Sequence, residues 1–387
     1  MIKKLALIIA VAALGVLLLI YPENCLNSAR YGLNLWLTAV FPSLFPFMAA
    51  SFLLLQTGVV RLIAHVFAPV TRTLFFAPGE SAYVFIASAM SGYPLGARLT
   101  GELYASGQID EAQAQRIVRF TSVSGPVFIT GAVSTGMLGM PEAGIYLAVA
   151  HYLSAIVVGI LYGCFARRQQ LRANKSPNPR FADALRQFKK DAAVCPPVGE
   201  LLANSVEKAI MTMLKLGGLI ILFSVVLEMM LVTRIMDALS WAYSPFTSLA
   251  GLNKAGAQAL LYGGVEMTSG CARAAALAGA ASMKLPLISG IIAFGGLCIH
   301  MQTRAVLASG GLKLKRFGLA KTIQAMCACG LTTLLLWLFP LTTAASSITG
   351  ETKTAAFGGV IFAAAALVVL LGIKIWQRSR RTALPFT

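Results

Sequence analysis

Six apolar stretches along the chain are long enough to cross a bilayer. A membrane-spanning helix needs about 20 consecutive apolar residues, and the six stretches are Leu5 to Tyr21, Leu35 to Leu55, Ala143 to Phe165, Leu216 to Val232, Ile323 to Phe339 and Phe357 to Ile375. Four further segments are apolar but interrupted by Gly, Ser, Thr or Pro, namely Ser81 to Ala105, Arg116 to Leu138, Ala255 to Ala280 and Leu285 to Ala308. This pattern predicts an all-α polytopic membrane protein.

Basic residues set the predicted topology, because cytoplasmic loops of membrane proteins carry an excess of Lys and Arg. The most basic loop follows Phe165, and we expect this loop and both chain ends in the cytoplasm. Their basic residues are Lys3, Lys4, Arg167, Arg168, Arg172, Lys175, Arg180, Arg186, Lys189, Lys190, Arg378, Arg380 and Arg381. An ordinary span at Ser81 to Ala105 would put the loop outside. A re-entrant hairpin there, entering and leaving on the cytoplasmic side, puts the loop inside.

The second half of the chain gives the same arrangement in mirror image if Ala255 to Ala280 is a hairpin that enters from the outside. This threading places the stretch "LKLKRFGLAK" in the cytoplasm, with its basic residues Lys313, Lys315, Arg316 and Lys321. The sequence therefore predicts two inverted repeats, each with a re-entrant helical hairpin and a broken transmembrane helix, and about eight full spans in total.

Glycines support the repeat, because Gly96 and Gly270 hold similar places in the two hairpins, as Gly125 and Gly296 do in the two broken spans. The domains expected from this pattern are an N-terminal transmembrane anchor (1–34), a first repeat (35–166), a basic cytoplasmic loop (167–202), a second repeat (203–340), and a C-terminal transmembrane helix with a basic tail (341–387).

Composition agrees with a membrane protein. Of 387 residues, 57% are hydrophobic and 12% are charged, against about 25% charged in an average soluble protein. The net charge of +18 would suit nucleic acid, but the basic residues lie between apolar runs rather than on one amphipathic face, so we expect no nucleic-acid partner. The N-terminal apolar run is followed by no A-x-A cleavage site, which favours an uncleaved anchor over a signal peptide.

The sequence contains no catalytic or nucleotide-binding motif of the forms G-x-S-x-G, H-E-x-x-H, G-x-x-x-x-G-K-[ST] or G-x-G-x-x-G. Its seven cysteines are scattered, and the close pair Cys327 and Cys329 has neither a partner pair nor a histidine nearby, which argues against a zinc site or a disulfide framework. We therefore expect no enzymatic activity, no cofactor and no metal site.

The Gly, Ser, Thr and Pro residues that interrupt these four apolar segments predict a binding site. Non-helical backbone is tolerated inside a membrane only where it is buried in protein or lines a polar cavity, and free N–H groups at helix ends favour an anion or a polar ligand. The alternative is a set of kinked helices that pack through their glycines. The predicted ligand contacts are Ser91, Gly92, Tyr93, Pro94, Gly96 and Arg98 (first hairpin), Ser122, Ser124, Gly125 and Pro126 (first broken span), Glu266, Thr268, Ser269 and Gly270 (second hairpin), and Gly295, Gly296, His300 and Gln302 (second broken span).

Glu266 is the residue expected to couple transport to a proton or another cation, because a carboxylate at membrane depth is costly unless it is paired, protonated or bound to a cation. Direct substrate contact is a second interpretation, and a salt bridge with Arg273 or Arg98 that only fixes packing is a third. Arg98 itself would either meet a substrate carboxylate or reach the cytoplasmic surface. Three other polar residues are expected at the membrane interfaces, namely His65, His151 and Glu228.

Five segments resemble, in order, those of the sporulation integral membrane protein YlbJ family. They are "VFPSLFPFMAASFLL", "MSGYPLGARLTGELYASGQID", "TSVSGPVFITGAVSTGMLG", "GGVEMTSGCARAAAL" and "AFGGLCIHMQTRAVL", and the resemblance runs from about Leu35 to about Pro340. The family belongs to the wider group with the nucleoside recognition, or Gate, domain, which looks like the concentrative nucleoside transporters. In the second hairpin this chain has Met267 where the family's Glu-Ile-Thr-x-Gly pattern has Ile.

The resemblance implies a transporter of dipicolinic acid, which moves from the mother cell toward the forespore across the outer forespore membrane of an endospore-forming bacterium. We expect a secondary transporter with alternating access, driven by protons, cations or the substrate gradient. A nucleoside or other small-metabolite carrier and a non-transporting scaffold of the spore envelope are the alternatives. Beyond the bilayer and the substrate, the partners left open are a second copy of the chain and other sporulation membrane proteins.

Overall fold

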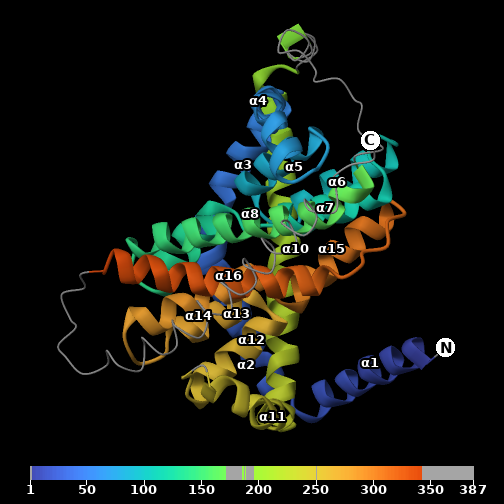
Figure 1. Ribbon diagram of the computed structural model, residues 1–387. Coiled ribbons are helices and arrows are strands. Elements are labelled where there is room, and N and C mark those ends of the chain that lie inside the picture. Colours follow the sequence, from blue (N-terminus) through green and yellow to red (C-terminus); the bar gives the residue numbers. More distant parts are fainter. Residues whose placement is uncertain (1, 171–184, 187, 189–195, 250, 342–387) are drawn as a thin grey trace.

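Helices make up the architecture of the chain. The computed structural model describes residues 2–170, 185, 186, 188, 196–249 and 251–341, and no strand occurs within them (Figure 1). Five helical runs in this part of the chain are long and apolar enough to cross a membrane, and they are Pro22–Gln56, Ala143–Phe165, Val198–Val232, Ala281–Ser309 and Phe317–Leu338. The prediction of an all-α polytopic membrane protein is confirmed.

After the N-terminal helix α1 (Ile2–Ile20), the two halves of the chain have the same order of elements. The first half has a long run (α2 Pro22–Leu35, η1 Trp36–Val40, α3 Phe41–Gln56), a shorter helix (α4 Val59–Leu74), a helix pair (α5 Glu80–Ser91, α6 Leu95–Ala105), an interrupted helix (α7 Glu111–Thr121, η2 Phe128–Met137) and a long helix (α8 Ala143–Gln170). The second half has α10 (Val198–Val232), α11 (Ile235–Leu249), the pair α12 (Lys254–Val265) and α13 (Met267–Ala275), the interrupted α14 (Ala281–Phe294) and α15 (Gly296–Ser309), and α16 (Phe317–Leu338). The opposite orientation of the halves and the domain bounds stay predictions.

Short polar signals in the sequence begin several of these helices. The Asp110 carboxylate accepts the Gln113 backbone N–H at 2.8 Å while the Gln113 side chain accepts from the Asp110 N–H at 2.9 Å, so a capping box starts α7. The Asn253 side chain accepts the Gly256 N–H at 2.8 Å and caps α12. Between α3 and α4 the chain turns at Gly58, whose φ of 77° suits glycine.

The four helices of the two helix pairs are each too short to cross a membrane. They have 12, 11, 12 and 9 residues, and at about 1.5 Å per residue none reaches much beyond half of the roughly 30 Å hydrocarbon core. Within each pair the helices pack against each other, and Gly263 of α12 is in backbone contact with Gly270 of α13. The chain therefore reverses at each tip, as the hairpin prediction requires. Entry of each hairpin from one side of the membrane stays a prediction.

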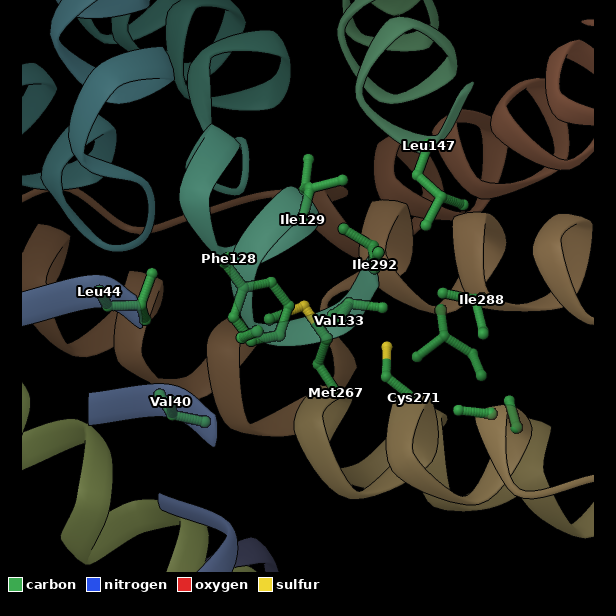
Figure 2. Close-up of a cluster of buried hydrophobic side chains, with 14 of the residues drawn as sticks. Val40, Leu44, Phe128, Ile129, Val133, Leu147, Met267, Cys271, Ile288 and Ile292 are labelled. Carbon is green, nitrogen blue, oxygen red and sulfur yellow. The ribbon is translucent and has the colours of Figure 1, made fainter. Parts of the chain in front are cut away.

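Two hydrophobic clusters join the halves. In the larger one, Phe128 and Val133 of η2 pack with Met267 and Cys271 of α13 (Figure 2). In the smaller one, α6 and α7 pack with α15 and α16. Counterpart helices also pair, since α10 runs along α2 and α3, and α8 lies beside α16 (Figure 1). The halves are thus interlocked rather than placed end to end.

Some predicted boundaries and placements differ from the structure. The predicted span starting at Leu216 is the second part of the longer helix α10, and α10 begins at Val198, within the predicted basic loop. The side chains of His151 and Lys321, expected at an interface and in a cytoplasmic loop, are both buried. The predicted span Phe357 to Ile375, the basic tail, and most of the basic loop lie outside the described residues.

Candidate functional site

The tip of the first hairpin packs against the break in the following helix. A Cβ atom on Gly92 would lie 2.7 Å from the backbone nitrogen of Gly125, and Gly92 has a φ of 76°, which glycine tolerates best. Nearby, a Cβ on Gly96 would lie 2.7 Å from the carbonyl oxygen of Thr121. These glycines therefore let two interrupted backbones touch.

The second half repeats this contact with its own residues. A Cβ on Gly296, at the start of α15, would lie 2.9 Å from the carbonyl oxygen of Gly263 and 3.0 Å from that of Val265, at the second hairpin tip. The two half-sites also meet, because the Tyr93 hydroxyl lies 3.5 Å from the position of a Cβ on Gly295. The structure thus brings together the four segments that the sequence singled out.

Side chains of α8 bond the backbone groups freed at the first break. The Ser124 N–H donates to His151 Nε2 at 2.9 Å, and the Tyr152 hydroxyl lies 3.0 Å from the Ser124 carbonyl oxygen and 3.2 Å from that of Ala89. A free backbone group in the membrane is costly, so His151 belongs to the interior and not to an interface. Its 1% exposed side chain corrects that prediction.

The second break has a histidine as well. His300 Nε2 lies 3.0 Å from the carbonyl oxygen of Phe294, the last residue of α14, and this ring is buried. Gln302, also predicted to contact ligand, donates to the Cys298 sulfur at 3.3 Å within α15. His300 therefore lies at the break, whereas the Gln302 side chain bonds within its own helix.

Glu266 is buried and caps a helix. Its side chain is 3% exposed, Oε1 accepts the Thr268 N–H at 2.8 Å, and Oε2 accepts the Ser269 N–H at 2.6 Å. The start of α13 carries a partial positive charge, which stabilises this carboxylate without an ion pair. The Arg273 guanidinium instead lies 3.7 Å from the centre of the Tyr262 ring.

Arg98 is placed apart from the other predicted contact residues. Its Nε lies 2.9 Å from Glu102 Oε1, one turn along α6, and the two side chains are 63% and 57% exposed. Neither Arg98 nor Arg273 therefore forms the salt bridge with Glu266 that was one interpretation of the sequence. The exposed pair contributes little to stability, as such pairs commonly do.

Lys321 is the residue that sequence reasoning missed. Its side chain is 0% exposed, and Nζ donates to Tyr93 Oη at 3.0 Å, to the Ser122 carbonyl oxygen at 2.8 Å and to Gln324 Oε1 at 2.6 Å. The Ser122 carbonyl is at the C-terminal end of α7, which carries a partial negative charge and favours a cation. Lys321 was assigned to the loop by its basic neighbours. Its spacing of four and three residues from the buried Phe317 and Gln324 was the helical signal that could have found it.

Several buried polar atoms around this meeting point lack a hydrogen-bond partner among the described residues. They are the hydroxyl oxygens of Ser91, Ser122 and Ser269, and Nδ1 of His151. Buried polar groups are nearly always bonded in native proteins. These atoms are therefore available to a ligand or to water.

A cavity of about 560 Å³ lies elsewhere, between α4, α5 and α6. Its polar lining includes His65, Arg72, Glu80 and Glu102. None of the predicted ligand contacts lines it. It is therefore distinct from the meeting point of the hairpin tips and helix breaks, which we call the central site.

Comparison with known proteins supplies the family. No protein-family model and no solved structure matches the chain. The chain is 34% identical over 328 residues to the sporulation integral membrane protein YlbJ of Bacillus subtilis (strain 168), an alignment that covers 84% of this chain and 80% of that protein. Because this alignment leaves out so little of either chain, it includes most of the segments that carry the resemblance in sequence. With this identity over this length, the chain belongs to the YlbJ family of sporulation integral membrane proteins.

Proposed function

We propose that this sporulation membrane protein is a secondary transporter of a small anionic aromatic metabolite, dipicolinic acid, which it moves from the mother cell toward the forespore. The observation that carries the proposal is the central site, where two hairpin tips and two helix breaks meet around buried hydroxyls that have no hydrogen-bond partner among the described residues. Interrupted helices around a central substrate are the common construction of secondary transporters.

Dipicolinate suits this chemistry because it is small, aromatic and carries two carboxylates. Hydroxyl groups such as those of Ser122 and Ser269, and free N–H groups at helix starts, are donors that bind carboxylate oxygens. The family membership places the chain in sporulation. We assign it to the outer forespore membrane, as the family resemblance implies, and we place both chain ends in the cytoplasm on the charge pattern of its loops.

Coupling to a proton or a cation is part of the proposal. The chain has no nucleotide-binding motif, so the energy has to come from an ion or substrate gradient. Glu266 is the proposed coupling residue, because its neighbours Val265 and Met267 adjoin the second helix break at Gly296. A carboxylate substrate bound there would repel the Glu266 carboxylate, and uptake of a proton or cation at Glu266 would relieve the repulsion.

Two alternatives make different predictions. A nucleoside carrier would bind nucleosides rather than dicarboxylates at the central site. A spore-envelope scaffold would transport nothing, and substitutions at the central site would act only through the amount of folded protein. The buried Lys321 side chain, which is compensated best by a negative charge, favours an anionic substrate over a neutral nucleoside.

The test is uptake of radiolabelled dipicolinate into proteoliposomes that contain the purified full chain. We expect saturable uptake that unlabelled dipicolinate inhibits and nucleosides do not. Empty liposomes provide the control for leakage. Inhibition by nucleosides would support the nucleoside carrier instead. No uptake under any imposed proton or cation gradient, with protein shown to be folded, would refute transport.

A further inference from the structure

Lys321 is a buried lysine that lacks an acidic partner within the described part of the chain. All three of its hydrogen-bond acceptors are uncharged, and the ion pairs found there involve other residues. Moving an ammonium group out of water is costly, and neutral acceptors offset that cost only in part. A carboxylate that binds Lys321 would neutralise the charge of the ammonium group and offset the rest of this cost.

The Tyr93 hydroxyl gives such a carboxylate a hydrogen-bond donor. Its oxygen accepts from Lys321, and its own proton has no acceptor among the residues that the structure describes. A hydroxyl that accepts from an ammonium is polarised and donates more strongly. The Tyr93 side chain is only partly buried, and its hydroxyl faces the helix break at Gly295.

Two further groups adjoin the same point. Helix α15 has 14 residues and begins at Gly296 without a side-chain cap, whereas Glu266 already caps α13. The start of α15 carries a partial positive charge, which favours an anion. The unpartnered hydroxyl of Ser122 belongs to the residue whose carbonyl binds Lys321, and its side chain is 2% exposed.

We propose that Lys321 and Tyr93 together bind one carboxylate of the substrate, so that the protein selects aromatic carboxylates over their neutral amides. This inference rests on the proposed function and adds to it two specificity-determining residues. The contact between Tyr93 and Gly295 is of ordinary van der Waals length. The Lys321 ammonium donates all three of its protons in the structure. A turn of the Tyr93 side chain away from Gly295 therefore frees one of these protons, and the carboxylate then accepts from both Lys321 and Tyr93.

The test measures equilibrium binding of dipicolinate and of its neutral diamide to the purified full chain in detergent. Wild-type protein should bind the diamide at least about tenfold more weakly, since a charge-assisted hydrogen bond is lost. Lys321→Gln and Tyr93→Phe should each weaken dipicolinate binding by roughly 10- to 100-fold and leave diamide binding nearly unchanged. The matched control is Lys284→Gln, because the Lys284 ammonium also donates to a backbone carbonyl, that of Ala275, at 3.2 Å, but away from the central site.

Each outcome decides the inference. If Lys321→Gln keeps both the affinity and the preference for the carboxylate, Lys321 is not the binding group, while the proposed function stands. If wild-type protein binds the diamide as tightly as dipicolinate, the inference fails even without any variant, which covers the case that a variant does not fold. If wild-type protein binds neither compound, both the inference and the proposed function fail.

Discussion

Single residues in this protein bond the backbone groups that the helix breaks set free. His151 and Tyr152 do this for Ser124, and His300 does it for Phe294. The sequence showed where the breaks are, because Gly, Ser and Pro mark them. It could not show which side chain of a distant helix reaches each break, since that depends on how the helices pack.

Tyr152→Phe should lower the stability of the protein. The hydroxyl of Tyr152 lies within hydrogen-bond distance of the carbonyl oxygens of Ser124 and Ala89, and leaving a buried carbonyl without its donor costs about 1 to 3 kcal/mol. The control is Tyr146→Phe, whose hydroxyl bonds the exposed Phe339 carbonyl and should matter by less than about 0.5 kcal/mol. Thermal unfolding in detergent measures both, and equal effects would refute this role for Tyr152.

Glu266→Gln should separate coupling from capping. The glutamine oxygen still accepts one of the two N–H groups that Glu266 accepts, but its NH2 group faces the other, so stability should fall by about 1 to 3 kcal/mol while the protein still folds. Dipicolinate uptake into proteoliposomes should no longer respond to an imposed proton or cation gradient. Glu228→Gln is the control, because Glu228 binds Asn24 at a distance from the central site. Gradient-driven uptake that survives in Glu266→Gln would exclude Glu266 as the coupling residue.

At the scale of elements, each hairpin tip fits against a helix break through glycine. The short helix pairs and the helix breaks were predictable, because Gly, Ser and Pro interrupt the apolar segments at these places. The contact between tip and break was not, since it depends on the approach of segments far apart in the chain. Arg98 was predicted to contact the ligand because it lies beside the hairpin tip in sequence. In the structure its side chain is exposed and pairs with Glu102 instead.

Alanine substitutions at matched glycines test this fit. Gly92 and Gly107 both have a positive φ, of 76° and 71°, so alanine should cost each about 1 to 3 kcal/mol in backbone strain. A Cβ on Gly92 would also meet the Gly125 backbone, whereas nothing lies within 4 Å of one on Gly107. Gly92→Ala should therefore sharply reduce the folded yield and the midpoint of thermal unfolding, and Gly107→Ala should not. Similar losses in both variants would mean that the close approach does not matter.

At the scale of the whole molecule, the two halves form one body. Two hydrophobic clusters draw residues from both halves, and α8 and α16 lie side by side. The sequence predicted the repeated order of elements but not this interlocking, which places η2 against α13 and α15 against α6. The excess of Lys and Arg in cytoplasmic loops also led us to place Lys321 in the cytoplasm. That rule counts charges in loops, whereas Lys321 lies on the buried face of α16.

A chain divided within the basic loop, between residues 170 and 198, should reassemble. Each half alone would expose the apolar surface that it shares with the other, and such surfaces promote aggregation and degradation. Two co-expressed halves should therefore purify together through a tag on one of them, whereas either half expressed alone should accumulate poorly. Halves that are equally abundant alone and do not purify together would contradict the interlocked fold.

Alternating access to the central site is the main claim of this account, and one labelling experiment tests it most directly. Ser122→Cys is introduced into a chain whose seven native cysteines are replaced by alanine, after dipicolinate uptake by that chain has been verified. A thiol reagent that cannot cross membranes is then applied to proteoliposomes from the outside or from the lumen. We predict labelling from either side, slowed in both cases by dipicolinate. Labelling from one side only, or labelling that dipicolinate does not slow, would contradict a carrier with its site at this point.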